Sequence, residues 1–214
     1  SNSLTNLSGT WSQPDTFTDP LGWGYYTGTF ASLAIDSSDK NHVAFYNSVL
    51  ASENQYNYTT NNSDDPECND WLGYNSNFIE ADGDGGHNSI AIRSDDVACV
   101  AYQDGNNMEL MYACNTNGGC SEGWPTELVD TNGNIGDYAT LAFDSSDNPY
   151  IAYYDITSAN LKLSYKTNGV WTTESLDMVG DVGNFVDMTI DVNDKVHIIY
   201  YDATNDAVKY AVGN

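Results

Sequence analysis

Apolar residues alternate with small or polar residues in four short stretches of the chain, each a few residues after a glycine. The alternating apolar pairs are Leu33 and Ile35, Ile90 and Ile92, Leu141 and Phe143, and Met188 and Ile190. A period of two predicts a β-strand with one buried face. A turn rich in Asp and Ser follows each stretch, and then a second alternating run, as in residues 150–154 and 197–201. Each pair of runs therefore predicts a β-hairpin.

The hairpins are copies of one motif that align without a gap. The copies read GTFASLAIDSSDKNHVAFYN, GGHNSIAIRSDDVACVAYQD, GDYATLAFDSSDNPYIAYYD and GNFVDMTIDVNDKVHIIYYD, and they begin at Gly28, Gly85, Gly136 and Gly183. Successive copies start about 50 residues apart, the length of one propeller blade. A third strand is predicted at residues 160–165 and 207–210, and a fourth is marked by Trp71, Trp124 and Trp171. The chain is thus expected to be an all-β, four-bladed β-propeller of four-stranded antiparallel blades.

The two ends of the chain complement each other. The fourth copy stops after its third strand, whereas Gly9-Thr10-Trp11 near the start matches Gly169-Val170-Trp171 of the third copy. We therefore expect an N-terminal strand to complete the last blade and close the ring, which removes an exposed sheet edge. The prediction is one domain over residues 1–214, with blades near 28–80, 85–130, 136–177, and 183–214 plus 8–18. Half of an eight-bladed ring, or part of a longer protein, remain alternatives.

Composition agrees with a folded β protein and restricts its partners. Hydrophobic residues make up 40% of the chain and aromatic residues 13%, with 16 Tyr. Six Lys plus Arg stand against 31 Asp plus Glu, a net charge of −25. Such a charge repels phosphate backbones and anionic lipid headgroups. No apolar run is long enough to span a membrane, so neither nucleic acid nor membrane insertion is expected.

Four cysteines, Cys68, Cys99, Cys114 and Cys120, lack the paired spacing of zinc sites. An even set without that spacing favours two disulfides in an oxidising compartment. Cys114 could pair with Cys120 and leave Cys68 for Cys99, or Cys99 could pair with Cys114 across two strands. Sequence alone does not choose among the three pairings.

The repeat resembles a known style of propeller. An aspartate after an apolar strand, followed by Asp-X-X-(Tyr or His)-(Ile or Val)-X-Tyr-Tyr-Asp, is similar to propeller repeats of bacterial secreted and surface-attached proteins, relatives in style of sialidase-like and lectin-like propellers. The resemblance implies an extracellular or cell-surface location. No copy contains the sialidase Asp-box, Ser-X-Asp-X-Gly-X-Thr-Trp. Sialidases clamp a carboxylate with three arginines, and Arg93 is the only arginine here, so a sialidase is excluded.

One face of the predicted propeller collects aromatic and acidic residues. Phe30, His87, Tyr138 and Phe185 enter the first strands, and the second strands end at Asn47, Asp104, Asp155 and Asp202. Aromatic rings stack on sugars or cations, and carboxylates accept hydrogen bonds from hydroxyls. The expected ligand contacts are Trp23, Tyr25, Tyr26, His87, Tyr138, Asp104, Tyr154, Asp155, Tyr201 and Asp202. The alternative is that these aromatics pack between blades and the aspartates stabilise turns.

Two further features are candidates for chemistry. Asp82 and Asp84, separated by glycine, resemble acidic loops that bind calcium, although the segment is too short for an EF-hand. Arg93 replaces the repeated aspartate, and we expect it to pair with Asp95 or Asp96. Calcium is the only cofactor that the sequence suggests.

These features together favour a secreted or cell-surface binding module that takes a glycan, or else a protein ligand, through loops around Trp23. Two alternatives are open. One is a structural or adhesive module of a larger surface protein, stabilised by calcium. The other is a glycosidase that uses Asp104, Asp155 and Asp202. Because no nucleophile motif is present, the sequence predicts that the protein is not an enzyme.

Overall fold

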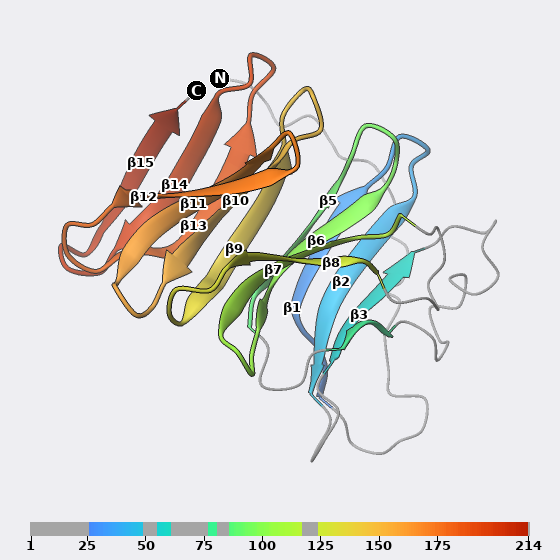
Figure 1. Cartoon of the computed structure of the whole chain (residues 1–214), viewed down its shortest axis with the longest axis horizontal. Coiled ribbons are helices and arrows are strands. Elements are labelled where there is room, and N and C mark those ends of the chain that lie inside the picture. Colours follow the sequence, from blue (N-terminus) through green and yellow to red (C-terminus); the bar gives the residue numbers. More distant parts are fainter. Residues whose placement is uncertain (1–25, 49–54, 61–76, 81–85, 117–123, 214) are drawn as a thin grey trace, which may run out of the picture.

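The computed structural model describes residues 26–48, 55–60, 77–80, 86–116 and 124–213 (Figure 1). All regular elements in these ranges are β-strands, and they form four antiparallel sheets. This confirms the all-β prediction for the described chain. No helix in these ranges is long and apolar enough to cross a membrane. We call each sheet a blade and number the blades in chain order.

The strands of each blade pair in chain order, as a meander. Blade 1 contains β1 (Tyr26–Ile35), β2 (Asn41–Ser48), β3 (Gln55–Thr60) and β4 (Asn77–Glu80). Blade 2 contains β5 (Asn88–Ile92), β6 (Ala98–Asp104), β7 (Glu109–Cys114) and β8 (Thr126–Asp130). Blade 3 contains β9 (Ile135–Phe143), β10 (Pro149–Asp155), β11 (Asn160–Thr167) and β12 (Val170–Asp177). Blade 4 contains β13 (Val182–Ile190), β14 (Val196–Asp202) and β15 (Ala207–Gly213).

The Asp-rich turn between the first two strands of a blade is held by its own first residue. In blade 4, Oδ1 of Asp191 accepts the backbone N–H groups of Asn193 (2.8 Å) and Lys195 (3.0 Å). These bonds lower the pKa of Asp191 to about 2. Asp194 has a φ of +60°, a left-handed conformation that Asp tolerates better than most residues. The same turn begins at Asp36 in blade 1 and at Asp144 in blade 3.

Hydrogen bonds also connect these turns from blade to blade. In each case a serine donates its backbone N–H and its hydroxyl to the two carboxylate oxygens of an aspartate in the next blade. The pairs are Ser37 with Asp96, Ser94 with Asp147, and Ser145 with Asp194. Val192 stands at the serine position in blade 4, so blade 4 has no hydroxyl donor at this position.

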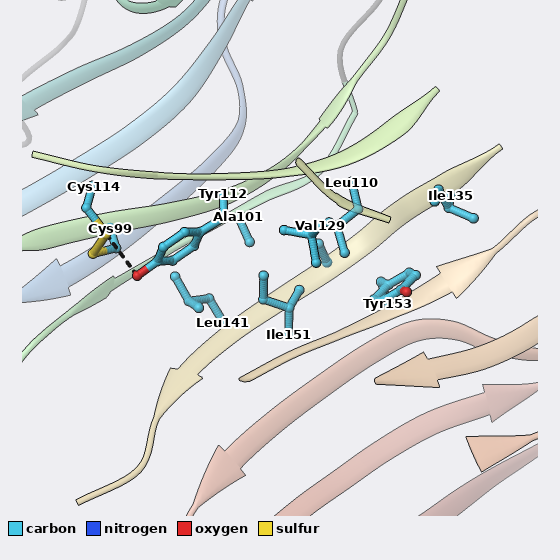
Figure 2. Close-up of a cluster of buried hydrophobic side chains, with 11 residues drawn as sticks. Cys99, Ala101, Leu110, Tyr112, Cys114, Val129, Ile135, Leu141, Ile151 and Tyr153 are labelled. Carbon is cyan, nitrogen blue, oxygen red and sulfur yellow. Dashed lines mark hydrogen bonds between the residues drawn. A yellow bond between two sulfur atoms is a disulfide. The ribbon is translucent and has the colours of Figure 1, made fainter. Parts of the chain in front are cut away.

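Apolar side chains fill the spaces between neighbouring blades. Figure 2 shows the space between blades 2 and 3, where Leu110 and Tyr112 of β7 face Leu141 of β9 and Ile151 of β10. A second cluster joins blades 1 and 2, and a third joins blades 3 and 4. The alternation along the first and second strands thus buries one face of each blade against its neighbour, as the period of two requires.

Blade 4 carries an apolar face that no described residue covers. Leu161 on β11 is fully buried by blade 4, whereas Val208, at the same repeat position, is 77% exposed. Ile199 and Tyr210 are likewise exposed on this face. Leu33 and Ile35 are exposed on the outer side of blade 1, although the equivalent positions of later blades are buried or half-buried.

The prediction of a closed ring is therefore corrected for the described residues. Blades 1 and 4 lie at opposite ends of an open row (Figure 1). Closure depends on the angle at which neighbouring blades pack. Side-chain packing sets that angle, and a count of repeats does not reveal it. The expected closing strand, residues 8–18, lies outside the described residues.

One disulfide is described, between Cys99 of β6 and Cys114 of β7. The two residues are direct cross-strand partners, with Cα atoms 4.1 Å apart. The hydroxyl of Tyr112 lies 2.8 Å from Sγ of Cys114 (Figure 2). This excludes the pairing of Cys114 with Cys120 and of Cys68 with Cys99. Cys68 and Cys120 lie outside the described residues.

Candidate functional site

Four rings, one from each blade, form a continuous row beside the innermost strands. Phe30, His87, Tyr138 and Phe185 follow one another with ring centroids 4.4, 4.2 and 4.5 Å apart. We call these four residues the aromatic row. Phe185 at one end is 66% exposed, and Phe30 at the other end is exposed as well. The row is therefore packed internally and open to solvent at both ends.

An irregularity in the first strand of the blade turns these rings toward one another. Phe30, Tyr138 and Phe185 have φ angles of +53°, +53° and +51°. Each lies where the pairing of the first and second strands shifts register. A left-handed conformation is unfavourable for a bulky residue and persists only where the surrounding structure holds it. The backbone conformation that places the rings in a row is therefore destabilising by itself.

The centre of the row contains a hydrogen-bonded pair from two blades. Nδ1 of His87 lies 2.9 Å from Oδ1 of Asp137, which also accepts the backbone N–H of Tyr138. No described residue bonds to Nε2 of His87 or to the hydroxyl of Tyr138. Burial, followed by the nearby Asp137 carboxylate, raises the pKa of Tyr138. Its hydroxyl therefore stays protonated at neutral pH and can donate to a ligand.

Asp137 is the residue of this site that the sequence prediction did not name. Its repeat position is occupied by Thr29, Gly86 and Asn184 in the other blades. A carboxylate at one of four equivalent positions is a departure from the repeat, and that signal was visible in the aligned copies. His87 is the corresponding departure in the aromatic row, and the structure brings the two departures together.

Tyr154 and Tyr201 lie at the same end of their blades but bond in different ways. The Tyr154 hydroxyl donates to Oδ1 of Asp181 (2.7 Å), which links blade 3 to blade 4. Burial and this bond raise the pKa of Tyr154 to about 12. The Tyr201 hydroxyl donates to Asp206 on the surface of blade 4, and its ring centroid lies 6.4 Å from that of Phe185. Tyr201 therefore extends the row, whereas Tyr154 serves a joint between blades.

The three second-strand aspartates face their own turns rather than a shared space. Oδ1 of Asp104 accepts the backbone N–H of Asn106, and Asp155 accepts both the N–H and the hydroxyl of Ser158. Asp202 accepts the side-chain and backbone N–H groups of Asn205, which lower its pKa. Asp155 and Asp202 are also buried. In the described chain these carboxylates stabilise turns, as the alternative interpretation of the repeat expected.

The remaining predicted site residues cannot be placed beside the row. Trp23, Tyr25, Asp82 and Asp84 lie outside the described residues, and only the backbone of Tyr26, the first residue of β1, is described. In the part of the chain that is described, no group of three or more His, Cys, Asp or Glu side chains could hold a metal ion. Arg93 bonds to Asp95 at 2.9 Å, the local pairing that the sequence predicted.

Comparisons with known proteins identify the fold. No family model and no curated protein matches the sequence. Among solved structures, the chain is similar to a protein of unknown function from Dyadobacter fermentans, with 10% identity over 86% of this chain and 60% of that one, and a TM-score of 0.58. It is also similar to the α-L-arabinofuranosidase PaAbf62A from Podospora anserina in complex with cellotriose, with 13% identity, coverages of 89% and 64%, and a TM-score of 0.53.

A third similar structure is the endo-arabinase from Bacteroides thetaiotaomicron, with 10% identity, coverages of 85% and 72%, and a TM-score of 0.51. The chain spans 60% and 64% of the lengths of the first two proteins. At these identities the similarity shows a β-propeller-like fold. No specific family is identified.

The comparisons contradict the prediction that the protein is not an enzyme. Two of these three similar structures are enzymes, an arabinofuranosidase and an endo-arabinase. The prediction relied on the absence of a nucleophile motif. Glycan cleavage by paired acid and base groups needs side chains brought together by the fold, and such pairs leave no local sequence motif.

Proposed function

We propose that the protein binds a glycan along the aromatic row. The observation that carries this proposal is a solvent-facing row of four rings whose two central members have polar atoms that no described residue bonds to. Sugar rings present apolar C–H faces that stack on aromatic rings, and hydroxyls that pair with polar groups at their edges. Phe185 and Phe30 supply the stacking surfaces. Nε2 of His87 and the Tyr138 hydroxyl supply the hydrogen bonds.

The His87–Asp137 bond orients the imidazole for this role. In a neutral imidazole, donation from Nδ1 to a carboxylate leaves Nε2 as an acceptor. A sugar hydroxyl can then donate to Nε2 and accept from the Tyr138 hydroxyl. A hydrogen-bond acceptor beside a hydrogen-bond donor selects a ligand that has a hydroxyl group at this point over one that has an apolar group.

Three further observations support a glycan and an extracellular setting. The similar arabinofuranosidase structure contains cellotriose. The described disulfide is typical of an oxidising compartment. The net charge of −25 disfavours polyanionic ligands. We therefore propose a secreted or cell-surface protein that takes neutral glycans. Trp23, Tyr25 and Tyr26 remain proposed contacts on the adjoining segment.

The test is a glycan array, followed by affinity measurements on variants. Phe185→Ala should weaken binding to a selected glycan at least about tenfold, since one stacking ring contributes on the order of 1.5 kcal/mol or more. Tyr138→Phe removes only the hydroxyl and should weaken binding about fivefold. Tyr210→Ala is the matched control, because this ring is also exposed on blade 4 but lies outside the row. If a selected glycan binds equally well to Phe185→Ala and Tyr138→Phe, the aromatic row is not the binding site. If no glycan on the array binds, the proposal of a glycan ligand is wrong, and a structural or adhesive module is favoured.

Glycan cleavage is a second candidate, and the His87–Asp137 pair is the observation that favours it. An imidazole held by a carboxylate on one nitrogen and open on the other is the arrangement of a general base. Release of reducing ends from plant or algal polysaccharides would detect the activity. Asp137→Asn should then reduce the rate by orders of magnitude, far more than it weakens binding. A rate unaffected by Asp137→Asn would remove this pair from the reaction.

A further inference from the structure

A pocket of about 400 Å³ lies between blades 3 and 4, away from the aromatic row. Blade 3 contributes Tyr150, Leu163, Tyr165, Glu174 and Leu176, and blade 4 contributes Val196, Ile198, Ala211, Val212 and Gly213. The walls are largely apolar, with one carboxylate. Its volume is within the range of pockets that accommodate an organic ligand or a large side chain.

The equivalent space is filled by a tryptophan at the two preceding joints. Trp171 at the start of β12 packs edge-on against Tyr112 of the preceding blade, with ring centroids 5.3 Å apart. Trp124, which directly precedes β8, packs in the same way against Tyr58, at 4.8 Å. The fourth strand of a blade thus places its tryptophan on the third strand of the blade before it.

The pocket contains the matching residues for one more tryptophan. Leu163 occupies the repeat position of Tyr58 and Tyr112, so it lies where the indole ring would pack. Glu174 occupies the repeat position of Glu127, which accepts the indole N–H of Trp171 at 3.0 Å. One oxygen of Glu174 accepts the Tyr165 hydroxyl, and the other has no partner among the described residues. A buried indole N–H needs such an acceptor.

The edge of the adjoining blade has no strand partner among the described residues. Blades 1, 2 and 3 each have a fourth strand, whereas the described residues pair with β15 on one side only, through β14. An open strand edge next to an apolar pocket can add another strand, with backbone bonds from the edge and specificity from the pocket. The occupant must therefore be extended and must carry a tryptophan near its start.

We propose that residues 8–18 of this chain pair with β15 as the fourth strand of blade 4, with the indole of Trp11 in the pocket and its N–H donating to Glu174. Gly9-Thr10-Trp11 matches Gly169-Val170-Trp171, which places Trp11 at the repeat position of Trp171. Of the other tryptophans, Trp71, Trp124 and Trp171 precede or begin fourth strands of their own blades, and Trp23 matches no repeat position. Pro14 is compatible with this placement, because a fourth strand lies at the sheet edge.

Hydrogen exchange of the 214-residue chain tests the proposal without any ligand. The amides of β15 that face away from β14 should be protected, and Trp11→Ala should accelerate their exchange about a hundredfold, because a buried aromatic ring is lost from the docked strand. Gln13→Ala, in the same segment, is the matched control and should leave the exchange within about threefold of the original rate. Amides of β10 should exchange equally in all three proteins, which shows that each variant is folded.

Two results would overturn the proposal. The first is that the outward amides of β15 exchange at the same rate in the original protein and in Trp11→Ala. The second is that protection of β15 increases with protein concentration, because the strand would then come from a second copy. Neither result bears on glycan binding, so failure of this proposal and failure of the proposed function can be told apart.

Discussion

Lys162 of β11 offers a sharp test of how the blades are joined. Its Nζ lies 2.5 Å from Oδ2 of Asp130, at the end of the preceding blade, and 3.8 Å from Asp155. The Tyr153 hydroxyl donates to the same oxygen of Asp130 at 2.6 Å. The side chain of Lys162 is only 9% exposed. Removing the ammonium by Lys162→Met would leave a buried carboxylate with one charge partner fewer.

The expected cost of Lys162→Met is about 3 kcal/mol, the usual loss when one member of a buried ion pair is removed. For a domain of this size, that corresponds to a decrease in melting temperature of roughly 6–12 °C. Blade 4 provides the matched control. Lys209 makes the equivalent bonds to Asp177 and Asp202, but its side chain is 36% exposed. Lys209→Met should therefore lower the melting temperature much less than Lys162→Met does, because water screens the pair.

The stability lost in Lys162→Met should depend on pH in a defined direction. Burial raises the pKa of Asp130, but hydrogen bonds from Lys162 and Tyr153 outweigh burial and hold its pKa below the ordinary value. A depressed carboxyl pKa stabilises the fold above the unfolded pKa of about 4 and loses this effect as pH falls through the folded pKa. The difference between Lys162→Met and the original protein should therefore be largest near pH 7 and shrink below about pH 4.

Thermal and urea unfolding from pH 3 to 7 would measure these differences. The double variant Lys162→Met with Asp130→Asn should recover most of the loss, because no buried charge is left without a partner. Equal losses for Lys162→Met and Lys209→Met, or a loss that does not depend on pH, would refute the claim that the buried charge pair holds this joint.

Four other predictions concern the disulfides, the serine–aspartate hydrogen bonds between blades, and calcium. Reducing the bond between Cys99 and Cys114, which are 15 residues apart, should lower stability by about 3 kcal/mol in urea unfolding, and no change would mean that the strand pair holds without it. Non-reducing peptide mapping should find a second disulfide between Cys68 and Cys120, the one remaining pairing, and free thiols there would contradict it. Ser94→Ala removes the hydroxyl that bonds to Asp147 and should cost about 1 kcal/mol or less, because water can replace that bond at an exposed carboxylate. A larger loss in thermal unfolding would show that the serine–aspartate bonds between blades act cooperatively. If Asp82 and Asp84 bind calcium, calcium should raise the melting temperature and a chelator should reverse the change, whereas indifference to both would remove the calcium site.

Local chemistry explains why the hairpins were predictable from sequence. The predicted runs at residues 150–154 and 197–201 lie within β10 and β14, and the predicted third strands lie within β11 and β15. Alternation of apolar residues and an aspartate that binds its own turn act over a few residues, so the sequence displays them directly. The cross-blade contacts of His87 with Asp137 were not predicted, because they join residues 50 positions apart.

The amino-acid sequence by itself determined four repeats of antiparallel strands, their turns and the acidic, aromatic character of the surface, because each depends on neighbours along the chain. The tertiary structure decided which cysteines pair, that Asp155 and Asp202 stabilise turns, and that the four blades form an open row with an aromatic row along one side. These outcomes depend on strand register and on the packing angle between blades. Both are set by many side chains from distant parts of the chain acting together, so no single stretch of sequence carries them.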